Sequence, residues 1–333
     1  MHGLIVSACP ANTNSRRGRS GPVARYADRR AGTVGLQRYG GAVQTTTTQN
    51  ASPADREDPQ PGAAIGLGTS TVHPESTASA FELAAILGYD GVELMIGVDP
   101  PSTDIGYVRK LQDFHQVAVL SVHAPCLMIT QHIWGDGWEK LRRSCAAAAQ
   151  LGADIVVVHP PFRWQTGYAR DFVTGIRELS AETGITLAVE NMYPWRGPGA
   201  CLQGYLPGWD PTDQDYDALT LDLSHAATAR LQALDLVARW GARLRHVHLT
   251  DGRGSIRDEH LFPGEGNQHA WELVTELGRR GYRGHIVHEI DTRSAGSRDD
   301  REQRLAGCLA ETRRRYLAGL PAGGMLPTDG PQA

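Results

Sequence analysis

The chain has 333 residues, of which 41% are hydrophobic and 21% are charged, and its formal net charge is −4. This composition suits a globular protein with a sizeable core, and the acidic balance argues against binding of a polyanion through bulk electrostatics. No apolar run approaches the roughly 18–20 residues that span a bilayer, and the five cysteines form no C-x-x-C pair. We therefore expect a soluble cytoplasmic protein with no membrane segment, disulfide framework or zinc ribbon.

Residues 1–62 differ from the rest of the chain. They are rich in Gly, Ser, Thr, Arg and Pro, and no apolar period of 2 or 3.6 persists in them. Such a segment cannot bury enough surface to offset its ordering entropy. We expect a disordered extension or an over-extended translation start, although an Arg- and Ser-rich, acid-poor start also resembles an organelle transit peptide. Residues 319–333 are expected to form a loose C-terminal tail.

Between residues 63 and 318, short apolar runs alternate with helical stretches. Helices are expected near 75–87, 107–115, 138–151 and 300–317, and Gly88 and Gly152 are placed to end two of them. Strands are expected near 64–67, 91–95, 117–122, 155–158, 186–189, 219–221, 244–249 and 286–290. Few polar residues interrupt these strands, as is typical of a parallel sheet covered by helices.

Eight strand–helix units of this size predict a single α/β domain, a (β/α)8 TIM barrel over residues 63–318. A doubly wound sheet is the alternative architecture. Its phosphate loop is poorly matched, because the segment from Gly66 to Thr71 lacks the third glycine of that motif. The barrel is favoured.

Seven of the eight expected strands carry or end at an acidic or imidazole side chain. These residues are Glu93, His123, His159, Glu190, Asp222 with His225 just beyond, His248 and Glu289. A lone histidine is more often a packed core residue, and a lone acid can cap a helix or a turn. In a parallel barrel, however, all these strand ends open on one face, where unpaired charge is costly unless a cation lies between the groups. Mixed imidazole and carboxylate ligands favour Zn, Mn or Co over Ca or Mg.

The loop after the seventh strand adds a further candidate pair, Asp258 and His260, followed by Gly264 and Gly266. Two residues in an extended segment at this spacing point to the same side, as chelation requires. The glycines allow the loop to turn back across the barrel mouth.

At this point the sequence resembles the xylose isomerase-like barrel superfamily, over roughly residues 64–318. In the epimerases of that superfamily, Glu, Asp, His and Glu from strands 5 to 8 hold one metal ion. Endonuclease IV enzymes extend the set to three zinc ions with two further histidines, D-x-x-H and D-x-H before G-E-G. The resemblance therefore implies a divalent metal, Zn or Mn, as one to three ions, held by Glu190, Asp222, His248, Glu289, His123, His159, His225, Asp258 and His260.

The loops depart from the endonuclease pattern. The residues after Glu190 read Asn191-Met192-Tyr193-Pro194 where those nucleases have N-T-A-G, and Ala226-Ala227-Thr228 follows the D-x-x-H motif. The ligand set is matched, but the loops that would grip DNA are not recognisable.

The first functional hypothesis is a metal-dependent isomerase or epimerase of sugars or sugar phosphates. Glu190 and Glu289 would transfer a proton through an enediolate that the metal stabilises. The candidate substrate-binding residues are Glu93, Trp164, Tyr193 and Arg257, although the aromatic residues of this region fit lid packing equally well. The partner would be a small molecule, and a homo-oligomer is left open.

The second hypothesis is a zinc-dependent phosphodiesterase of the abasic-site endonuclease type, the only reading in which nucleic acid is a partner. The complete ligand set favours it, and the acidic barrel and altered loops count against it. A barrel that binds a ligand without catalysis is a third alternative, disfavoured because buried acids without a task are costly.

Overall fold

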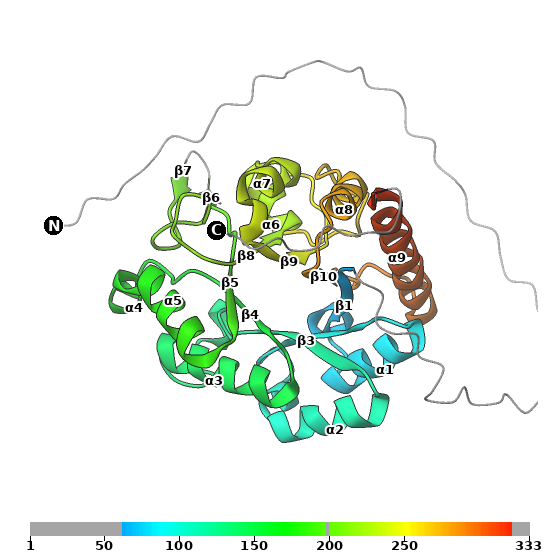
Figure 1. Cartoon of the computed structure of the whole chain (residues 1–333), viewed down its shortest axis with the longest axis horizontal. Helices are drawn as coiled ribbons and strands as arrows, with labels where there is room; N and C mark the ends of the chain where they lie inside the picture. The colour runs from blue at the N-terminus through cyan, green and yellow to red at the C-terminus, as the bar shows by residue number, and fades with distance from the viewer. Residues whose placement is uncertain (1–61, 198–199, 322–333) are drawn as a thin grey trace, which may run out of the picture. The chain divides into compact units, whose positions relative to one another are not determined.

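The computed structural model describes residues 62–197 and 200–321. The expected N-terminal extension, apart from Gly62, and most of the expected C-terminal tail lie outside these ranges. Eight parallel strands close into a barrel in the order β1-β10-β9-β8-β5-β4-β3-β2, which confirms the predicted fold (Figure 1). The barrel strands are β1 (Ala64–Gly68), β2 (Gly91–Met95), β3 (Ala118–His123), β4 (Ile155–Val158), β5 (Thr186–Glu190), β8 (Leu219–Asp222), β9 (Leu244–His248) and β10 (His285–His288).

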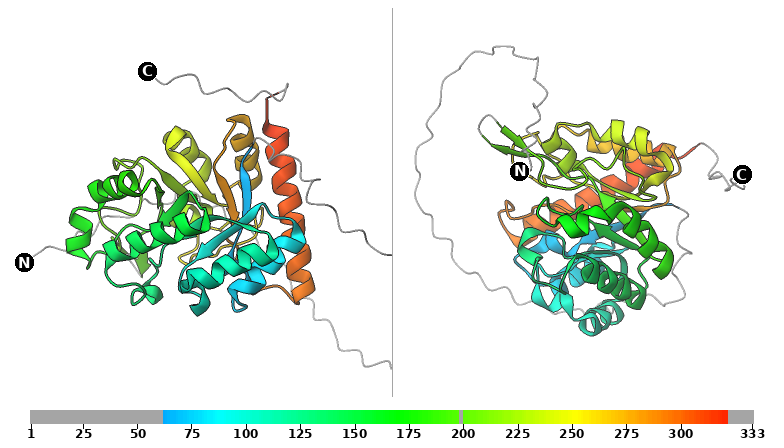
Figure 2. Two further views of the ribbon diagram at one scale, coloured as in Figure 1. Left: turned by 60° about the horizontal axis from the view of Figure 1, so that its bottom comes forward. Right: turned by 90° about the vertical axis from the view of Figure 1, so that its left-hand side faces the viewer.

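The helices lie outside this ring of strands (Figures 1 and 2). They are α1 (Thr77–Leu87), α2 (Ile105–His115), α3 (Gly137–Leu151), α4 (Thr166–Arg170), α5 (Phe172–Thr183), α6 (Leu223–Ala229), α7 (Ala233–Trp240), α8 (Ala270–Arg279) and α9 (Arg298–Gly319). Short 3-10 helices are η2 (Thr69–Val72), η3 (Pro100–Thr103), η4 (Met128–Thr130) and η5 (Gly241–Arg243). Within the described ranges, no helix is both long enough and apolar enough to cross a membrane.

Capping residues set the helix ends. The side chains of Ser76, Asp104 and Asp136 each accept a hydrogen bond from the backbone N–H three residues further on, so α1, α2 and α3 begin directly after them. These starts differ by one or two residues from the expected ones. Gly88 and Gly152 end α1 and α3 in the left-handed conformation, as predicted.

Side chains along each barrel strand alternate between the helix-covered side of the sheet and the barrel interior. Successive strand residues point to opposite sides of the sheet, so one set packs under the helices and the other fills the barrel. Val92, Val122, Val189, Leu221 and Val247 belong to the main apolar core. The intervening positions toward the carboxyl ends of the strands are polar and at most 1% exposed: Glu93, Ser121, His123, Glu190, Thr220, Asp222, His246 and His248.

The connection between β5 and β8 holds a two-stranded hairpin that the sequence did not predict. β6 (Trp195–Gly197) pairs antiparallel with β7 (Ala200–Leu202). Each strand has only three residues, too few to show an alternating pattern. Trp195 packs with Trp209 against a small cluster of Phe162, Met192 and Tyr205, separate from the main core.

Candidate metal centre

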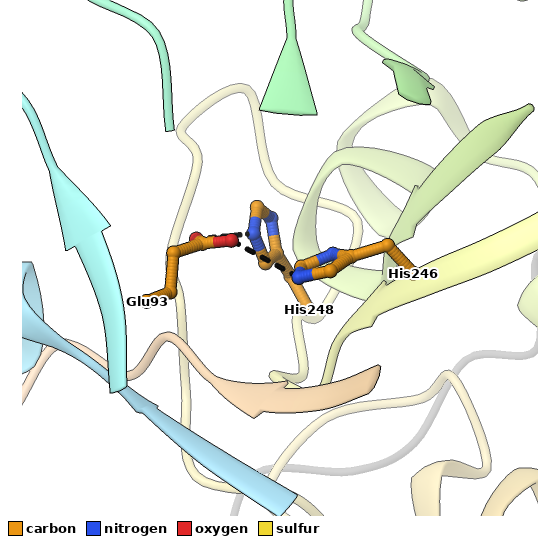
Figure 3. Close-up of side chains that lie close together, drawn as sticks. All are labelled: Glu93, His246 and His248. Carbon is orange, nitrogen blue, oxygen red and sulfur yellow. Dashed lines mark hydrogen bonds and ion pairs between the residues drawn. The ribbon is translucent and has the colours of Figure 1, made fainter. Parts of the chain in front are cut away.

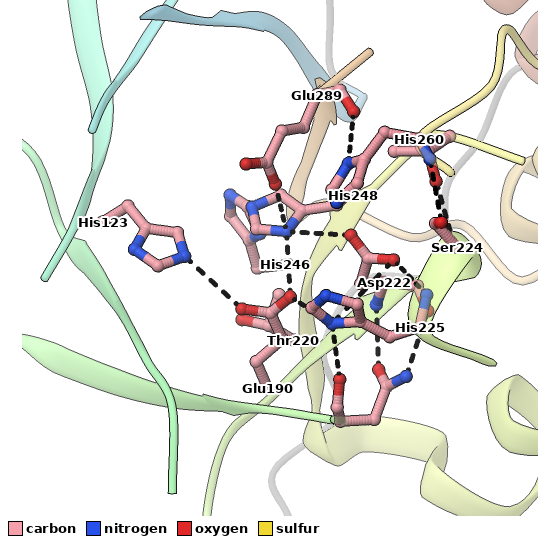
Figure 4. Close-up of polar contacts among 12 residues, drawn as sticks. His123, Glu190, Thr220, Asp222, Ser224, His225, His246, His248, His260 and Glu289 are labelled. Carbon is pink, nitrogen blue, oxygen red and sulfur yellow. Dashed lines mark hydrogen bonds and ion pairs between the residues drawn. The ribbon is translucent and has the colours of Figure 1, made fainter. Parts of the chain in front are cut away.

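Glu190, the last residue of β5, lies at the centre of the polar barrel mouth. Its Oε2 is 2.9 Å from Nε2 of His159 and 3.4 Å from Nε2 of His123. Its Oε1 is 3.0 Å from Nδ1 of His225. The carboxylate at the end of β5 therefore joins groups from the end of β3, the residue after β4 and the start of α6, as expected if strand ends converge. Figure 4 shows His123 and His225 on either side of Glu190.

His248 presents its two ring nitrogens to different partners. Nδ1 lies 2.9 Å from Oε2 of Glu289, 3.4 Å from Oε1 of Glu190 and 3.6 Å from Oδ2 of Asp222. On the other side of the ring, Nε2–H donates a 2.8 Å hydrogen bond to Oε1 of Glu93 (Figure 3). Because Nε2–H is held by Glu93, Nδ1 is the ring nitrogen that faces the three carboxylates.

A third group forms where α6 meets the loop after β9. Oδ2 of Asp258 is 3.0 Å from Nε2 of His225 and 2.9 Å from Nε2 of His260. The expected closeness of Asp258 and His260 is observed, but the expected reason is wrong: the φ of His260 is 42°, so the segment is not extended. Ser224 holds this turn, because its Oγ donates to Asp258 at 2.6 Å and accepts the backbone N–H groups of Glu259 and His260.

Backbone carbonyls orient three of the imidazoles. In each case the Nδ1–H group donates to a backbone carbonyl oxygen at 2.8–3.0 Å. The pairs are His123 with Ala124, His225 with Asn191, and His260 with Glu289. Each of these rings therefore turns Nε2 toward a carboxylate. Such support from the opposite nitrogen is typical of metal-binding histidines.

The residues fit a divalent ion. The donor atoms form three adjoining groups, each within 4.8 Å: His123, His159 and Glu190; Glu190, Asp222 and His248; Asp222, His225 and His260. Ligand bonds to zinc are about 2.0–2.3 Å long, so an ion can bridge such spacings after small adjustments. Oδ2 of Asp222 and Oε2 of Glu190 are buried and make no hydrogen bond of good geometry, although Nε2 of His159 lies 2.9 Å from Oε2 of Glu190. A cation between these groups would satisfy both oxygens.

A fourth compact group differs from the other three because its carboxylate already has hydrogen-bond partners. It consists of Glu93, His246 and His248. Glu93 accepts from Nε2–H of His248 at 2.8 Å, and its other oxygen lies 3.0 Å from Nε2 of His246 and 2.7 Å from Oγ of Ser121. Both oxygens are thus satisfied by direct hydrogen bonds. Glu93 therefore lies behind His248, and its expected contact with substrate remains a prediction.

A family model described as a xylose isomerase-like TIM barrel matches residues 81–311. The chain belongs to this family. An uncharacterized protein of Mycobacterium tuberculosis is 45% identical over 278 residues, which cover 78% of this chain and 99% of that protein. The fructoselysine 3-epimerase of Escherichia coli O157:H7 is 21% identical over 239 residues, covering 64% of this chain and 85% of the epimerase.

Solved structures agree with this family membership. A D-tagatose 3-epimerase-like protein superposes with a TM-score of 0.55 at 26% sequence identity, covering 76% of this chain and 99% of that chain. This likeness confirms that the xylose isomerase-like fold extends over the barrel described above.

A cavity of about 320 Å³ opens beside the candidate metal centre of this xylose isomerase-like barrel. Its polar lining includes Asp258, His260 and Glu289, and Ser70 and Ile129 form other parts of the wall. Oγ of Ser70 donates to Oε1 of Glu289 at 3.4 Å. A small molecule in this cavity would therefore meet one edge of the ligand cluster.

The other expected substrate-binding residues lie elsewhere around the mouth. Trp164 is 53% exposed and stacks on Phe162, with ring centroids 4.8 Å apart. The ring of Tyr193 lies 5.0 Å from that of His225, and Arg257 is exposed. None of Trp164, Tyr193 and Arg257 lines the cavity described above. Their contact with substrate remains a prediction.

Further residues, which the sequence did not predict, hold the candidate ligands in place. His246 had a readable signal, because it lies two positions before His248 in β9 and must face the same side. Asn191 accepts the backbone N–H of Asp222 and donates to its carbonyl, at 2.8 and 3.0 Å. Ser224 and Asn191 gave no such signal, because serine and asparagine are ordinary loop residues.

The charged groups of the candidate metal centre shift one another's pKa values. Burial alone would lower the pKa of His248, but Glu289, Glu93 and Glu190 raise it well above its ordinary value of 6.5. Burial alone would raise the pKa of Glu289, but His248 and His260 lower it to about 2. In the metal-free protein, a proton on His248 therefore takes the place of a cation.

We expect opposite pH trends for the metal-free and metal-loaded proteins. The raised imidazole pKa stabilises the metal-free fold fully below about pH 6.5, and this contribution is lost as the pH rises through the folded-state value. The lowered pKa of Glu289 stabilises the fold above about pH 4.5 and is lost as the pH falls toward 2. Between pH 6 and 9 the Tm of metal-free protein should fall, and the rise in Tm on adding Mn²⁺ should grow, because metal ligands must be deprotonated. Thermal melts with and without Mn²⁺ measure both, and a pH-independent Mn²⁺ effect would contradict this account.

Proposed function

We propose that this xylose isomerase-like barrel is a divalent-metal-dependent isomerase or epimerase of a sugar or sugar phosphate. The observation that carries the proposal is the meeting of three carboxylates at Nδ1 of His248, within 2.9–3.6 Å. One of these, Glu289, also lines the adjoining cavity. The similarity to a fructoselysine 3-epimerase and to a D-tagatose 3-epimerase-like protein supports this reaction class.

Glu190, Asp222, His248 and Glu289 would hold one ion, Zn or Mn. When bound, the ion supplies positive charge that stabilises negative charge developing on substrate oxygens. Glu93 keeps the proton on Nε2 of His248 and thereby fixes which nitrogen faces the carboxylates.

The two glutamates would share the proton transfer. One carboxylate removes the proton on the carbon next to the carbonyl, which gives an enediolate, and the other carboxylate returns a proton. Return to the opposite face of the same carbon is epimerisation, and return to the neighbouring carbon is isomerisation. The side chain of Glu289 is 13% exposed and lines the cavity. The side chain of Glu190 is only 1% exposed and lies deeper in the barrel.

A specific observation favours phosphodiester hydrolysis as the second candidate. Five further candidate ligands lie beside the four that would hold a single ion: His123, His159, His225, Asp258 and His260. His123 and His159 form one group with Glu190, His225 and His260 form another with Asp222, and Asp258 lies within 3.0 Å of both His225 and His260. Two or three zinc ions in such groups would serve to position and neutralise a phosphodiester. The net charge of −4 does not favour DNA.

Metal analysis combined with two assays separates these functions. The purified chain, stripped and reloaded with Mn²⁺, Co²⁺ or Zn²⁺, is incubated with ketohexoses and their 6-phosphates in D2O, and proton exchange is followed by NMR. The same preparations are tested for nicking of abasic DNA. We expect exchange and a new epimer or isomer with one bound ion and no nicking. Three zinc ions per chain with robust nicking and no exchange would overturn the proposal.

A further inference from the structure

Glu289 differs from the other three candidate ligands of a single ion in how its backbone is held. Glu190 lies within the pairing of β5 with β8, and Asp222 and His248 are partners in the pairing of β8 with β9. The strand pairing of β10 ends at His288, one residue before Glu289. Strand pairing therefore fixes three of these four residues and leaves the position of Glu289 to other contacts.

Thr71, in η2, supplies the missing support. Its Oγ1 donates to the carbonyl of His288 at 2.9 Å and accepts the backbone N–H of Ile290 at 3.2 Å. These groups belong to the two peptide units on either side of Glu289. Because β1 ends at Gly68, a side chain of η2 takes the place that the backbone of a longer β1 would fill beside β10.

η2 is itself anchored to neighbouring segments. Oγ1 of Thr69 accepts the backbone N–H of Met95, the last residue of β2, at 2.9 Å. Oγ1 of Thr292 donates to the carbonyl of Thr71 at 2.6 Å. The side chains that make these bonds belong to buried residues, so the bonds are protected from competition with water. Thr71 therefore has a fixed position from which it can hold the end of β10.

The hydroxyl hydrogen of Thr71 is committed to His288, so it is not offered to a molecule in the adjoining cavity, although Thr71 forms part of the cavity wall. We infer that Thr71 is a positioning residue for Glu289. It sets where the Glu289 carboxylate meets Nδ1 of His248, now 2.9 Å away, and thereby sets both the affinity for a divalent ion and the rate of proton transfer. The effect on rate rests on the proposed function, whereas metal affinity is measured without a substrate.

Replacing Thr71 with valine tests this role in the full-length protein. The new methyl group would need about 3.3–3.6 Å from a carbonyl oxygen, more than the hydroxyl needs, so it pushes the end of β10 away. We expect the Kd for Mn²⁺ to rise and kcat to fall, each by about 10–100-fold, with KM little changed. The loss of kcat should persist at saturating Mn²⁺, because Glu289 would also transfer a proton. Thr71→Ser keeps the hydroxyl and should restore most of both values.

Thr183→Val is the matched control. Oγ1 of Thr183 also donates to a carbonyl, that of Leu179 at 2.8 Å, and accepts a backbone N–H, that of Ile185 at 3.3 Å. These bonds lie at the end of α5, so their loss should leave the Kd for Mn²⁺ and kcat at the parent values. Thermal melts show which variants are folded. Thr71→Ala lacks the hydroxyl without adding a crowded methyl group, and it replaces Thr71→Val if that variant does not fold.

The outcomes separate this inference from the proposed function. Parent values of Kd and kcat in folded Thr71→Val or Thr71→Ala would overturn the inference and leave the proposed function intact. A loss that Thr71→Ser shares in full would also overturn it, because the effect would then belong to the methyl group. Absence of proton exchange by the parent protein with every sugar would refute the proposed function. A loss of Mn²⁺ affinity that serine restores would still support Thr71 as the residue that positions Glu289.

Discussion

Replacing Glu190 with glutamine is expected to lower kcat by about 10³-fold, within the range seen when a proton-transfer group is lost. The same change should weaken binding of Mn²⁺, because Glu190 belongs to two of the three ligand groups. A glutamine keeps the size of the side chain but presents an N–H₂ where Oε1 or Oε2 now faces an imidazole nitrogen. Turnover by NMR exchange and the Kd for Mn²⁺ by calorimetry measure the two effects.

The matched control for this variant is Glu178→Gln, an exposed position on α5. It should leave both turnover and metal affinity unchanged. If Glu190→Gln retained turnover within about tenfold of the parent at saturating Mn²⁺, Glu190 would not be a proton-transfer residue, and the role assigned to it would be wrong.

Replacing Glu93 with glutamine is expected to weaken Mn²⁺ binding by about 10–100-fold, the usual effect of removing a carboxylate that orients a ligating histidine. Both His246 and His248 donate an N–H to Glu93, and a glutamine offers one acceptor and one mismatched donor. His248 would then lose the bond that keeps its Nδ1 turned to the carboxylates. Much of the kcat should return at saturating Mn²⁺, because Glu93 acts through His248.

Ser121→Ala supplies the comparison for Glu93. It removes one 2.7 Å hydrogen bond to the same carboxylate without placing a donor against a donor. Its loss of Mn²⁺ affinity should therefore be clearly smaller than that of Glu93→Gln. Equal affinities for the Glu93→Gln and parent proteins would show that Glu93 does not position the ligand.

The fold could be predicted from the sequence because its signals are local. β-branched runs such as Ile155–Val158, and glycines such as Gly152 after a helical stretch, mark strands and helix ends directly. The closure of the barrel then follows from the number of units and the parallel order. The β6–β7 hairpin was not predictable, because strands this short depend on aromatic packing, here of Trp195 against Tyr205 and against Phe162 from the loop after β4.

The closeness of the candidate ligand residues could be predicted because strand ends meet on one face, and that is a property of the architecture. The partners behind them were not predictable in the same way. Whether Glu93 contacts a substrate or His248 depends on how deep the Glu93 side chain lies in the barrel. This depth cannot be read from the residue type at position 93. The reason offered for the pairing of Asp258 and His260 was wrong because Ser224 bends the backbone at His260 away from an extended path.

The side chains on the two faces of the barrel strands have different roles. The residues under the helices are apolar and give the sheet its stability, whereas the inward residues near the strand ends hold charge and hydrogen bonds. Substitutions on the inward face can therefore alter which ion or molecule is accepted while the layer that secures the architecture stays untouched. In such a scaffold, new chemistry is reached by exchanging single inward side chains or loops, without rebuilding the domain.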